Sequence, residues 1–127
     1  MSQSVLIVDD ESYIVTSLSY VMKNAGFEVD SAGDGEEALE KVKSKAPDLV
    51  ILDIMMPKLD GFEVCKQIRA NPDWNSVRII MLTAKGRDSE REKGLELGAD
   101  DYLTKPFSTR DILQRAKDVL AAARVAT

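Results

Sequence analysis

The sequence predicts an α/β protein, a doubly wound (βα)5 fold in which helices cover both faces of a five-stranded parallel sheet. Two observations support this prediction. Short apolar runs alternate along the chain with longer segments of helical periodicity, in five repeats of strand followed by helix. Residues 5–8 and 49–52 are apolar at every position, which is typical of strands buried on both faces of a parallel sheet.

The first two units occupy the first third of the chain. Apolar residues recur at helical spacing after the first strand, and Gly26 is the kind of residue that follows a helix end. Residues 27–32 alternate apolar and polar side chains, which indicates an edge strand. Asp34 and Glu37 form a pattern close to a capping box, so a second helix is expected to begin there.

The other three units repeat the order. The third strand ends on Asp53, the fourth on Thr83 and the fifth, a short one, just before Lys105. Asn71 and Pro72 break the third helix, and Gly98 closes the fourth. The expected strands span residues 5–8, 27–32, 49–53, 77–82 and 102–104. The expected helices lie between them, and a last one runs from residue 108 or 109 to about 123.

Composition narrows the classes of protein that fit. A chain of 127 residues with 44% apolar and 31% charged residues is expected to form one soluble domain over residues 1–127. No apolar run approaches the ~20 residues that span a bilayer. A single cysteine excludes an internal disulfide, which favours the cytoplasm. The chain has no histidine, and its net charge of −5 argues against direct contact with nucleic acid.

Reactive side chains stand at the ends of four of the expected strands. They are Asp9 and Asp10, Asp53, Thr83 and Lys105. The carboxyl ends of parallel strands meet at one edge of the sheet, where ligands bind in doubly wound folds. Clustered carboxylates favour Mg²⁺, and an adjacent lysine and hydroxyl favour a phosphoryl group. One carboxylate is then a candidate nucleophile, as in enzymes that form an aspartyl phosphate.

These residues, in this order and spacing, resemble the receiver domains of bacterial two-component response regulators. The resemblance extends from residue 5 to about residue 120, and implies a CheY-like, flavodoxin-type sheet with strand order 2-1-3-4-5. Each motif is weak alone, and their combination is specific. The motifs are Val8-Asp9-Asp10-Glu11, Leu52-Asp53-Ile54-Met55-Met56-Pro57, Asp60-Gly61, Leu82-Thr83-Ala84, Gly98-Ala99-Asp100-Asp101-Tyr102 and Lys105-Pro106-Phe107.

The resemblance also implies roles for individual residues. Asp53 is expected to accept the phosphoryl group from a sensor histidine kinase or a histidine phosphotransfer protein. Mg²⁺ is expected to be held by Asp10 and Asp53 directly, by Asp9 mainly through water, and by the backbone carbonyl of Met55. Lys105 and Thr83 are expected to contact phosphoryl oxygens, and the Lys105–Pro106 bond is expected to be cis. Such a chain is a switch that catalyses only its own phosphorylation and dephosphorylation.

Phosphorylation is expected to alter a signalling surface made by the fourth helix, the fifth strand and the fifth helix. Thr83 and Tyr102 match the family's switch pair, and the surface sequence resembles receivers of winged-helix DNA-binding regulators. Those receivers form homodimers through crossed ion pairs. The pairs expected here join Arg91 to Asp111 and Asp100 to Arg115. A third pair departs from the pattern, because Asp101 would face Asp118.

Simpler interpretations exist for the same residues. The acidic residues after the first strand suit any helix N-terminus, and Lys105 is by itself an ordinary solvated charge. A phosphatase with an aspartyl nucleophile generally has a second aspartate at the position of Met55, and a flavin phosphate would be repelled by Asp9 and Asp10. A receiver-like scaffold that no longer accepts phosphate would not need all of these side chains.

Overall fold

The computed structural model describes residues 3–56, 58–84 and 88–125. Five parallel strands form one sheet in the order β2-β1-β3-β4-β5, so the predicted fold class and strand order are confirmed. The strands are β1 (Ser4–Val8), β2 (Glu28–Ala32), β3 (Leu49–Asp53), β4 (Arg78–Ala84) and β5 (Asp101–Lys105). The helices are α1 (Ser12–Asn24), α2 (Gly35–Ser44), α3 (Gly61–Ala70), α4 (Asp88–Glu96) and α5 (Thr109–Val125). A short 3-10 helix, η1 (Pro72–Trp74), lies in the break predicted after α3.

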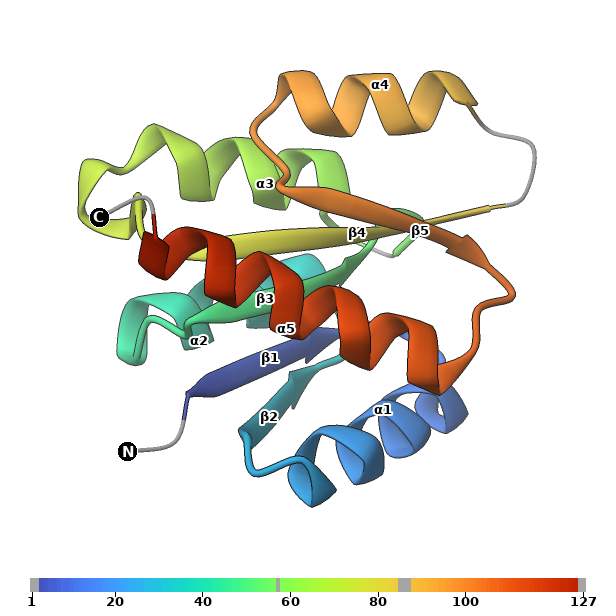
Figure 1. The fold of residues 1–127 in the computed structure, drawn as a ribbon. Coiled ribbons are helices and arrows are strands. Elements are labelled where there is room, and N and C mark those ends of the chain that lie inside the picture. The colour runs from blue at the N-terminus through green and yellow to red at the C-terminus, as the bar shows by residue number, and fades with distance from the viewer. Residues whose placement is uncertain (1–2, 57, 85–87, 126–127) are drawn as a thin grey trace.

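Helices cover both faces of the sheet (Figure 1). Apolar side chains alternate along each central strand, so each strand contributes to two separate cores. Leu6 and Val50 point to the core beneath α2 and α3, whereas Val5 and Ile51 point to the core beneath α1 and α5. Every residue of β3 is buried, as its continuous apolar pattern predicts for the central strand.

Several helix ends have the predicted local signals. The side chain of Asp34 accepts a hydrogen bond from the backbone N–H of Glu37 at the start of α2. Ser108, one of the two predicted caps, accepts from the N–H of Asp111 at the start of α5. Gly26 and Gly98 adopt φ angles of +97° and +108°, which favour glycine beyond a helix end. These signals are local, because each depends on residues within a few positions of the helix end.

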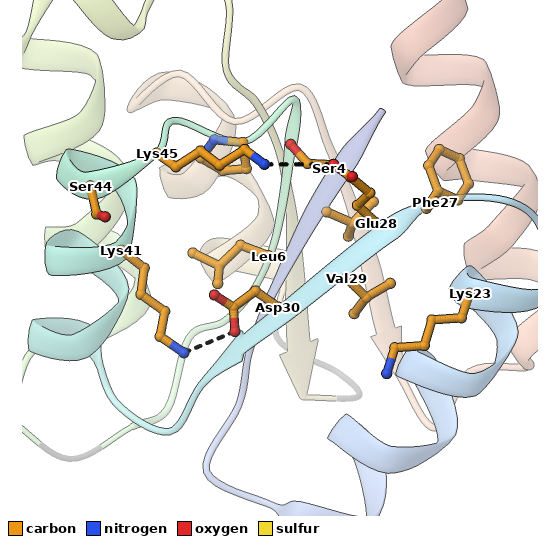
Figure 2. A pocket seen from close by; sticks show the side chains of 12 residues that line it. Ser4, Leu6, Lys23, Phe27, Glu28, Val29, Asp30, Lys41, Ser44 and Lys45 are labelled. Atoms are coloured by element: carbon orange, nitrogen blue, oxygen red, sulfur yellow. Dashed lines mark hydrogen bonds and ion pairs between the residues drawn. The ribbon is translucent and has the colours of Figure 1, made fainter. Parts of the chain in front are cut away.

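The β2 edge of the sheet, opposite the β5 edge, is protected by charged side chains. Lys41 of α2 lies 3.0 Å from Asp30 and also donates to the carbonyl of Ser31, while Lys45 pairs with Glu28 at 3.6 Å. These two pairs cross a cavity of about 500 Å³ beside the strand (Figure 2). Charged side chains on an edge strand oppose pairing with a further strand.

Candidate functional site

Three carboxylates converge where β1 and β3 end side by side. Val8 pairs with Leu52 in the sheet, so Asp9, which follows β1, lies next to Asp53, the last residue of β3. Asp9, Asp10 and Asp53 each present an oxygen within 4.8 Å of the others. Asp9 and Asp53 are buried and Asp10 is exposed. The predicted convergence of these three residues is therefore confirmed, and a set of carboxylate oxygens suits a hard cation such as Mg²⁺.

Lys105 supplies the positive charge at this cluster. Its Nζ lies 3.2 Å from Oδ2 of Asp9, 3.2 Å from Oδ1 of Asp53 and 3.4 Å from Oε1 of Glu11. The strand order brings it there, because β5 pairs with β4, which in turn pairs with β3. The Lys105–Pro106 bond is cis, as expected. Lys105 thus lies at the sheet edge where the sequence placed it, in contact with the acidic cluster.

Burial makes Asp53 an unusual carboxyl group. Burial, together with the negative charge of Asp9, raises the pKa of Asp53 to about 6, although Lys105 acts in the opposite direction. Its side chain is only 6% exposed. The ionised form of Asp53, which a nucleophilic reaction needs, is therefore destabilised in the folded chain. A cation bound beside it would stabilise that form.

The two neighbours of Asp53 respond to the same forces. Burial raises the pKa of Asp9, even though the N–H of Glu11 donates to its side chain and Lys105 lies close by. Burial alone would lower the pKa of Lys105, but the adjacent carboxylates of Asp53 and Asp9 raise it on balance. Lys105 consequently stays charged throughout the physiological pH range.

The loop after β3 approaches the backbone of Asp53 closely. The N–H of Gly61 donates to the carbonyl of Ile54, and a Cβ atom at position 61 would lie 2.5 Å from the carbonyl oxygen of Asp53. Only glycine fits there, which explains the Asp60-Gly61 motif. Met55 lies two residues after Asp53 and is 65% exposed. Pro57 lies outside the described residues.

Thr83 lies in β4, between β3 with Asp53 and β5, and its hydroxyl is directed toward β5. The side chain is buried, and Oγ1 donates to the carbonyl of Leu103 in β5 at 3.5 Å. Tyr102, its expected switch partner, is half-buried, and the guanidinium of Arg91 lies 4.5 Å from the centre of its ring. A contact between the Thr83 hydroxyl and a group on Asp53 therefore requires the hydroxyl to leave Leu103.

A cavity of about 520 Å³ opens beside Asp53. Asp53, Glu11 and Lys105 line its polar part. Its apolar walls come from α1 and from the segment after β5, through Tyr13, Ile14, Leu18, Pro106 and Phe107. This cavity joins the buried nucleophile candidate to the surface.

Glu11 and Tyr13 also line this site, and the sequence interpretation assigned neither of them a role. A hydrogen bond from the Tyr13 hydroxyl lowers the pKa of Glu11, and the positive charge of Lys105 acts in the same direction. The available signal is a third acidic residue directly after Asp9 and Asp10. Neither spacing nor composition shows that Glu11 reaches Lys105. From the sequence alone, Glu11 is only the last residue of the Val8-Asp9-Asp10-Glu11 motif.

Asp100, one of the residues expected at a dimer interface, forms ion pairs within the chain. Its carboxylate lies 2.9 Å from Nη2 of Arg69 and 3.0 Å from Nη1 of Arg78, and it accepts the N–H of Ile79 at 2.8 Å. Arg69 reaches it from the end of α3, and Arg78 from the start of β4. The expected partner, Arg115, contacts Asp101 instead.

The other expected interface residues also have partners in the chain. Nη1 of Arg115 lies 3.1 Å from Oδ1 of Asp101, and its Nε lies 3.8 Å from Asp111. Arg91 stacks on Tyr102. Any pairing of these charges across two chains therefore replaces contacts that each chain already makes.

Comparison with known families agrees with the geometry of the site. The family model described as "Response regulator receiver domain" matches residues 5–117. The chain belongs to the response regulator receiver domain family. It is therefore a receiver domain of two-component phosphorelay signalling, and three of the motifs that suggested the family supply Asp9, Asp10, Asp53 and Lys105 to the site.

Relatives of this receiver domain occur in transcriptional and chemotaxis regulators. It is 50% identical over 126 residues to the alkaline phosphatase synthesis transcriptional regulatory protein PhoP of Bacillus subtilis (strain 168). That match covers 99% of this chain and 52% of PhoP, so the chain spans about half the length of this curated relative.

Solved structures of receivers share the same fold. The chemotaxis response regulator CheY4 of Vibrio cholerae has a TM-score of 0.88 and 34% identity, over 94% of this chain and 99% of CheY4. A CheY-like receiver domain protein from Methanospirillum hungatei JF-1 has a TM-score of 0.91 and 28% identity over the full length of both chains. Among the described residues of this receiver, no helix is both long and apolar enough to cross a bilayer.

Proposed function

We propose that this receiver domain accepts a phosphoryl group on Asp53 in a Mg²⁺-dependent reaction. The donor is a phosphohistidine on a sensor histidine kinase or a histidine phosphotransfer protein, and it lies on a separate protein because this chain has no histidine. The observation that carries the proposal is the position of Asp53, a buried carboxylate 3.2 Å from a lysine ammonium and beside two further carboxylates. This arrangement suits phosphoryl transfer, which depends on positioning and charge neutralisation.

Each residue of the site has a part in this reaction. Asp53 supplies the attacking oxygen. Lys105 neutralises charge on the incoming phosphoryl oxygens, and the Thr83 hydroxyl turns from Leu103 to donate to one of them. Asp10, Asp53 and the backbone carbonyl of Met55 would hold the Mg²⁺ directly, and Asp9 mainly through water. The cation would lower the repulsion between the carboxylates and the phosphoryl group.

Phosphorylation of Asp53 results in a changed conformation of the signalling surface, and not in a released product. The dianionic phosphoryl group draws the Thr83 hydroxyl, Tyr102 turns inward behind it, and the surface of α4, β5 and α5 changes with it. The chain is then a switch and not a turnover enzyme, and residues 1–127 form a single receiver domain that works in the cytoplasm.

A phosphorylation-dependent homodimer through the same surface is a second part of the proposal. Arg91, Asp100, Asp111 and Arg115 are its candidate residues. The stacking of Arg91 on Tyr102 supports a link, because movement of the ring releases the guanidinium for Asp111 of a second chain. Measuring molar mass in solution before and after phosphorylation, for wild type and Arg91→Glu, tests this part.

The experiment that tests the central proposal is intact mass after incubation with acetyl phosphate and Mg²⁺. The wild type gains one phosphoryl group, and neither Asp53→Asn nor the wild type in EDTA does. A persistent adduct in Asp53→Asn would show that another residue is the nucleophile. No adduct in a folded wild type that binds Mg²⁺, at any incubation time, would contradict phosphoryl acceptance from this donor.

A further inference from the structure

We infer that Glu11 recognises the leaving group of the phosphodonor. It favours donors whose phosphoryl group is bonded to nitrogen over donors that release a carboxylate. This inference deepens the proposed function, because it rests on phosphorylation of Asp53. It assigns a specificity-determining role to a residue outside the set that holds the metal and contacts the phosphoryl group.

The position of Glu11 places it in the path of the donor. Asp53 is 6% exposed and reaches the surface through the 520 Å³ cavity, which Glu11 also lines. The Glu11 side chain is 42% exposed, whereas that of Lys105 is 22% exposed. A donor that brings its phosphorus atom to Asp53 through this cavity therefore passes Glu11.

The geometry of phosphoryl transfer then determines which part of the donor Glu11 meets. The attacking and leaving atoms lie roughly in line on opposite sides of phosphorus. Because Asp53 attacks from the buried side, the leaving group departs on the cavity side. The leaving group therefore faces Glu11, while the phosphoryl oxygens face Lys105.

The Glu11 carboxylate is a hydrogen-bond acceptor with two donors close by. Nζ of Lys105 lies 3.4 Å from its Oε1, and the Tyr13 hydroxyl donates to the same side chain. When Lys105 turns to the phosphoryl oxygens, Glu11 gives up part of that contact. Its carboxylate is then available to accept an N–H from the leaving group.

The two kinds of donor differ in charge at the leaving group. In both reactions an oxygen of Asp53 forms the new bond to phosphorus. Phosphoramidate carries an ammonium nitrogen, which takes the electron pair of the broken N–P bond and leaves as neutral ammonia. A phosphorylated imidazole that is protonated on its other ring nitrogen takes the electron pair of the broken N–P bond and leaves as neutral imidazole, whose ring N–H can donate to the carboxylate. Acetyl phosphate releases acetate, whose developing negative charge the Glu11 carboxylate repels.

The test is the ratio of two second-order rate constants for phosphorylation, that with phosphoramidate divided by that with acetyl phosphate. The variants are Glu11→Gln, which removes the charge and keeps the shape, and Glu11→Asp, which keeps the charge. Glu40→Gln, on the exposed face of α2, is the matched control for net charge. The ratio is the decisive quantity, because a structural defect alters both rate constants together.

The expected result is a fall of the ratio by about 3- to 10-fold in Glu11→Gln, as the loss of one charge pair at a partly exposed site implies. Glu11→Asp retains most of the wild-type ratio, and Glu40→Gln retains all of it. Raising the salt concentration reduces the difference between wild type and Glu11→Gln.

Two results would overturn the inference. If Glu11→Gln gains a phosphoryl group on Asp53 with an unchanged ratio, Glu11 does not select the donor, and the proposed function stands without it. If the wild type gains no phosphoryl group from either donor, the proposed function fails and this inference fails with it.

Discussion

The ammonium of Lys105 and the carboxylate of Asp53 lie 3.2 Å apart at the carboxyl edge of the sheet. One belongs to β5 and the other to β3, with β4 between them. The pair stabilises ionised Asp53 but does not offset its burial, since the pKa of Asp53 is still raised to about 6. Folding thus disfavours the ionised form of Asp53, the candidate nucleophile. A bound cation would favour that form, and a phosphoryl group would replace it.

The first prediction concerns stability and pH in Asp53→Asn. The pKa of Asp53 in the folded chain, about 6, exceeds its ordinary value of 3.8, so the folded state holds the proton more tightly than the unfolded state. Asp53 therefore costs nothing below about pH 4 and destabilises the fold as pH rises through 6. At about pH 8 without divalent cations, Asp53→Asn has a free energy of unfolding about 1–3 kcal/mol above that of the wild type.

Urea titrations in EDTA at about pH 8 and about pH 4 measure this difference. The gain is present at the higher pH and absent at the lower one. A variant that is less stable than the wild type at about pH 8 would show that ionised Asp53 is favourable in the fold, against this expectation.

The second prediction concerns Mg²⁺ and Asp10. A ligand that binds only the folded state stabilises it by about 2.7 kcal/mol at one hundred times its dissociation constant. The wild type should therefore gain stability steadily with the logarithm of Mg²⁺ concentration, and Asp10→Asn should lose most of that gain. Thermal unfolding across a Mg²⁺ series measures both, with Glu40→Gln as the control that keeps the full response. Equal responses in Asp10→Asn and the wild type would place the cation elsewhere.

The third prediction concerns the loop after β3. In Gly61→Ala the new methyl group would lie 2.5 Å from the carbonyl oxygen of Asp53, so the backbone has to shift. We expect a loss of about 1–3 kcal/mol in the free energy of unfolding and slower phosphorylation of Asp53. Gly33→Ala is the control, because its Cβ meets only Glu37 Oε1 at 3.8 Å. Chemical denaturation measures the loss of stability, and the acetyl phosphate assay measures the rate of phosphorylation, for both variants. Equal stability and equal rates in Gly61→Ala and Gly33→Ala would contradict the close contact at position 61.

The fourth prediction concerns Asp100. In Asp100→Asn, Arg69 and Arg78 lose the carboxylate that joins the end of α3 to the start of β4 and β5. Hydrogen bonds to charged groups contribute about 1.5–3 kcal/mol, so the free energy of unfolding should fall by about that amount. Asp118→Asn, on the exposed face of α5, should change it by less than about 0.5 kcal/mol. An Asp100→Asn variant as stable as the wild type, but defective in dimerisation, would favour the interface role instead.

Much of the fold can be predicted from local signals in the sequence. Alternating apolar runs and helical segments predict the (βα)5 class, and the continuous apolar pattern of β3 predicts its burial on both faces. The caps at Asp34 and Ser108 and the glycines at 26 and 98 are local as well, because each depends on residues within a few positions. The 3-10 helix η1 was not predicted, since Asn71 and Pro72 specify that a helix ends there and do not specify the conformation of the next residues.

The sequence by itself placed these residues at one edge of the sheet, since parallel strands have their carboxyl ends on the same side. The strand order then decided which of these ends are neighbours. Only the tertiary structure decided how those side chains pair. In the folded chain Glu11 lies next to Lys105, and the Thr83 hydroxyl donates to Leu103. Asp100 pairs with Arg69 and Arg78, and burial raises the pKa of Asp53. Backbone pattern is encoded by neighbouring residues, whereas burial and ion pairing depend on the distances between segments that only packing brings together.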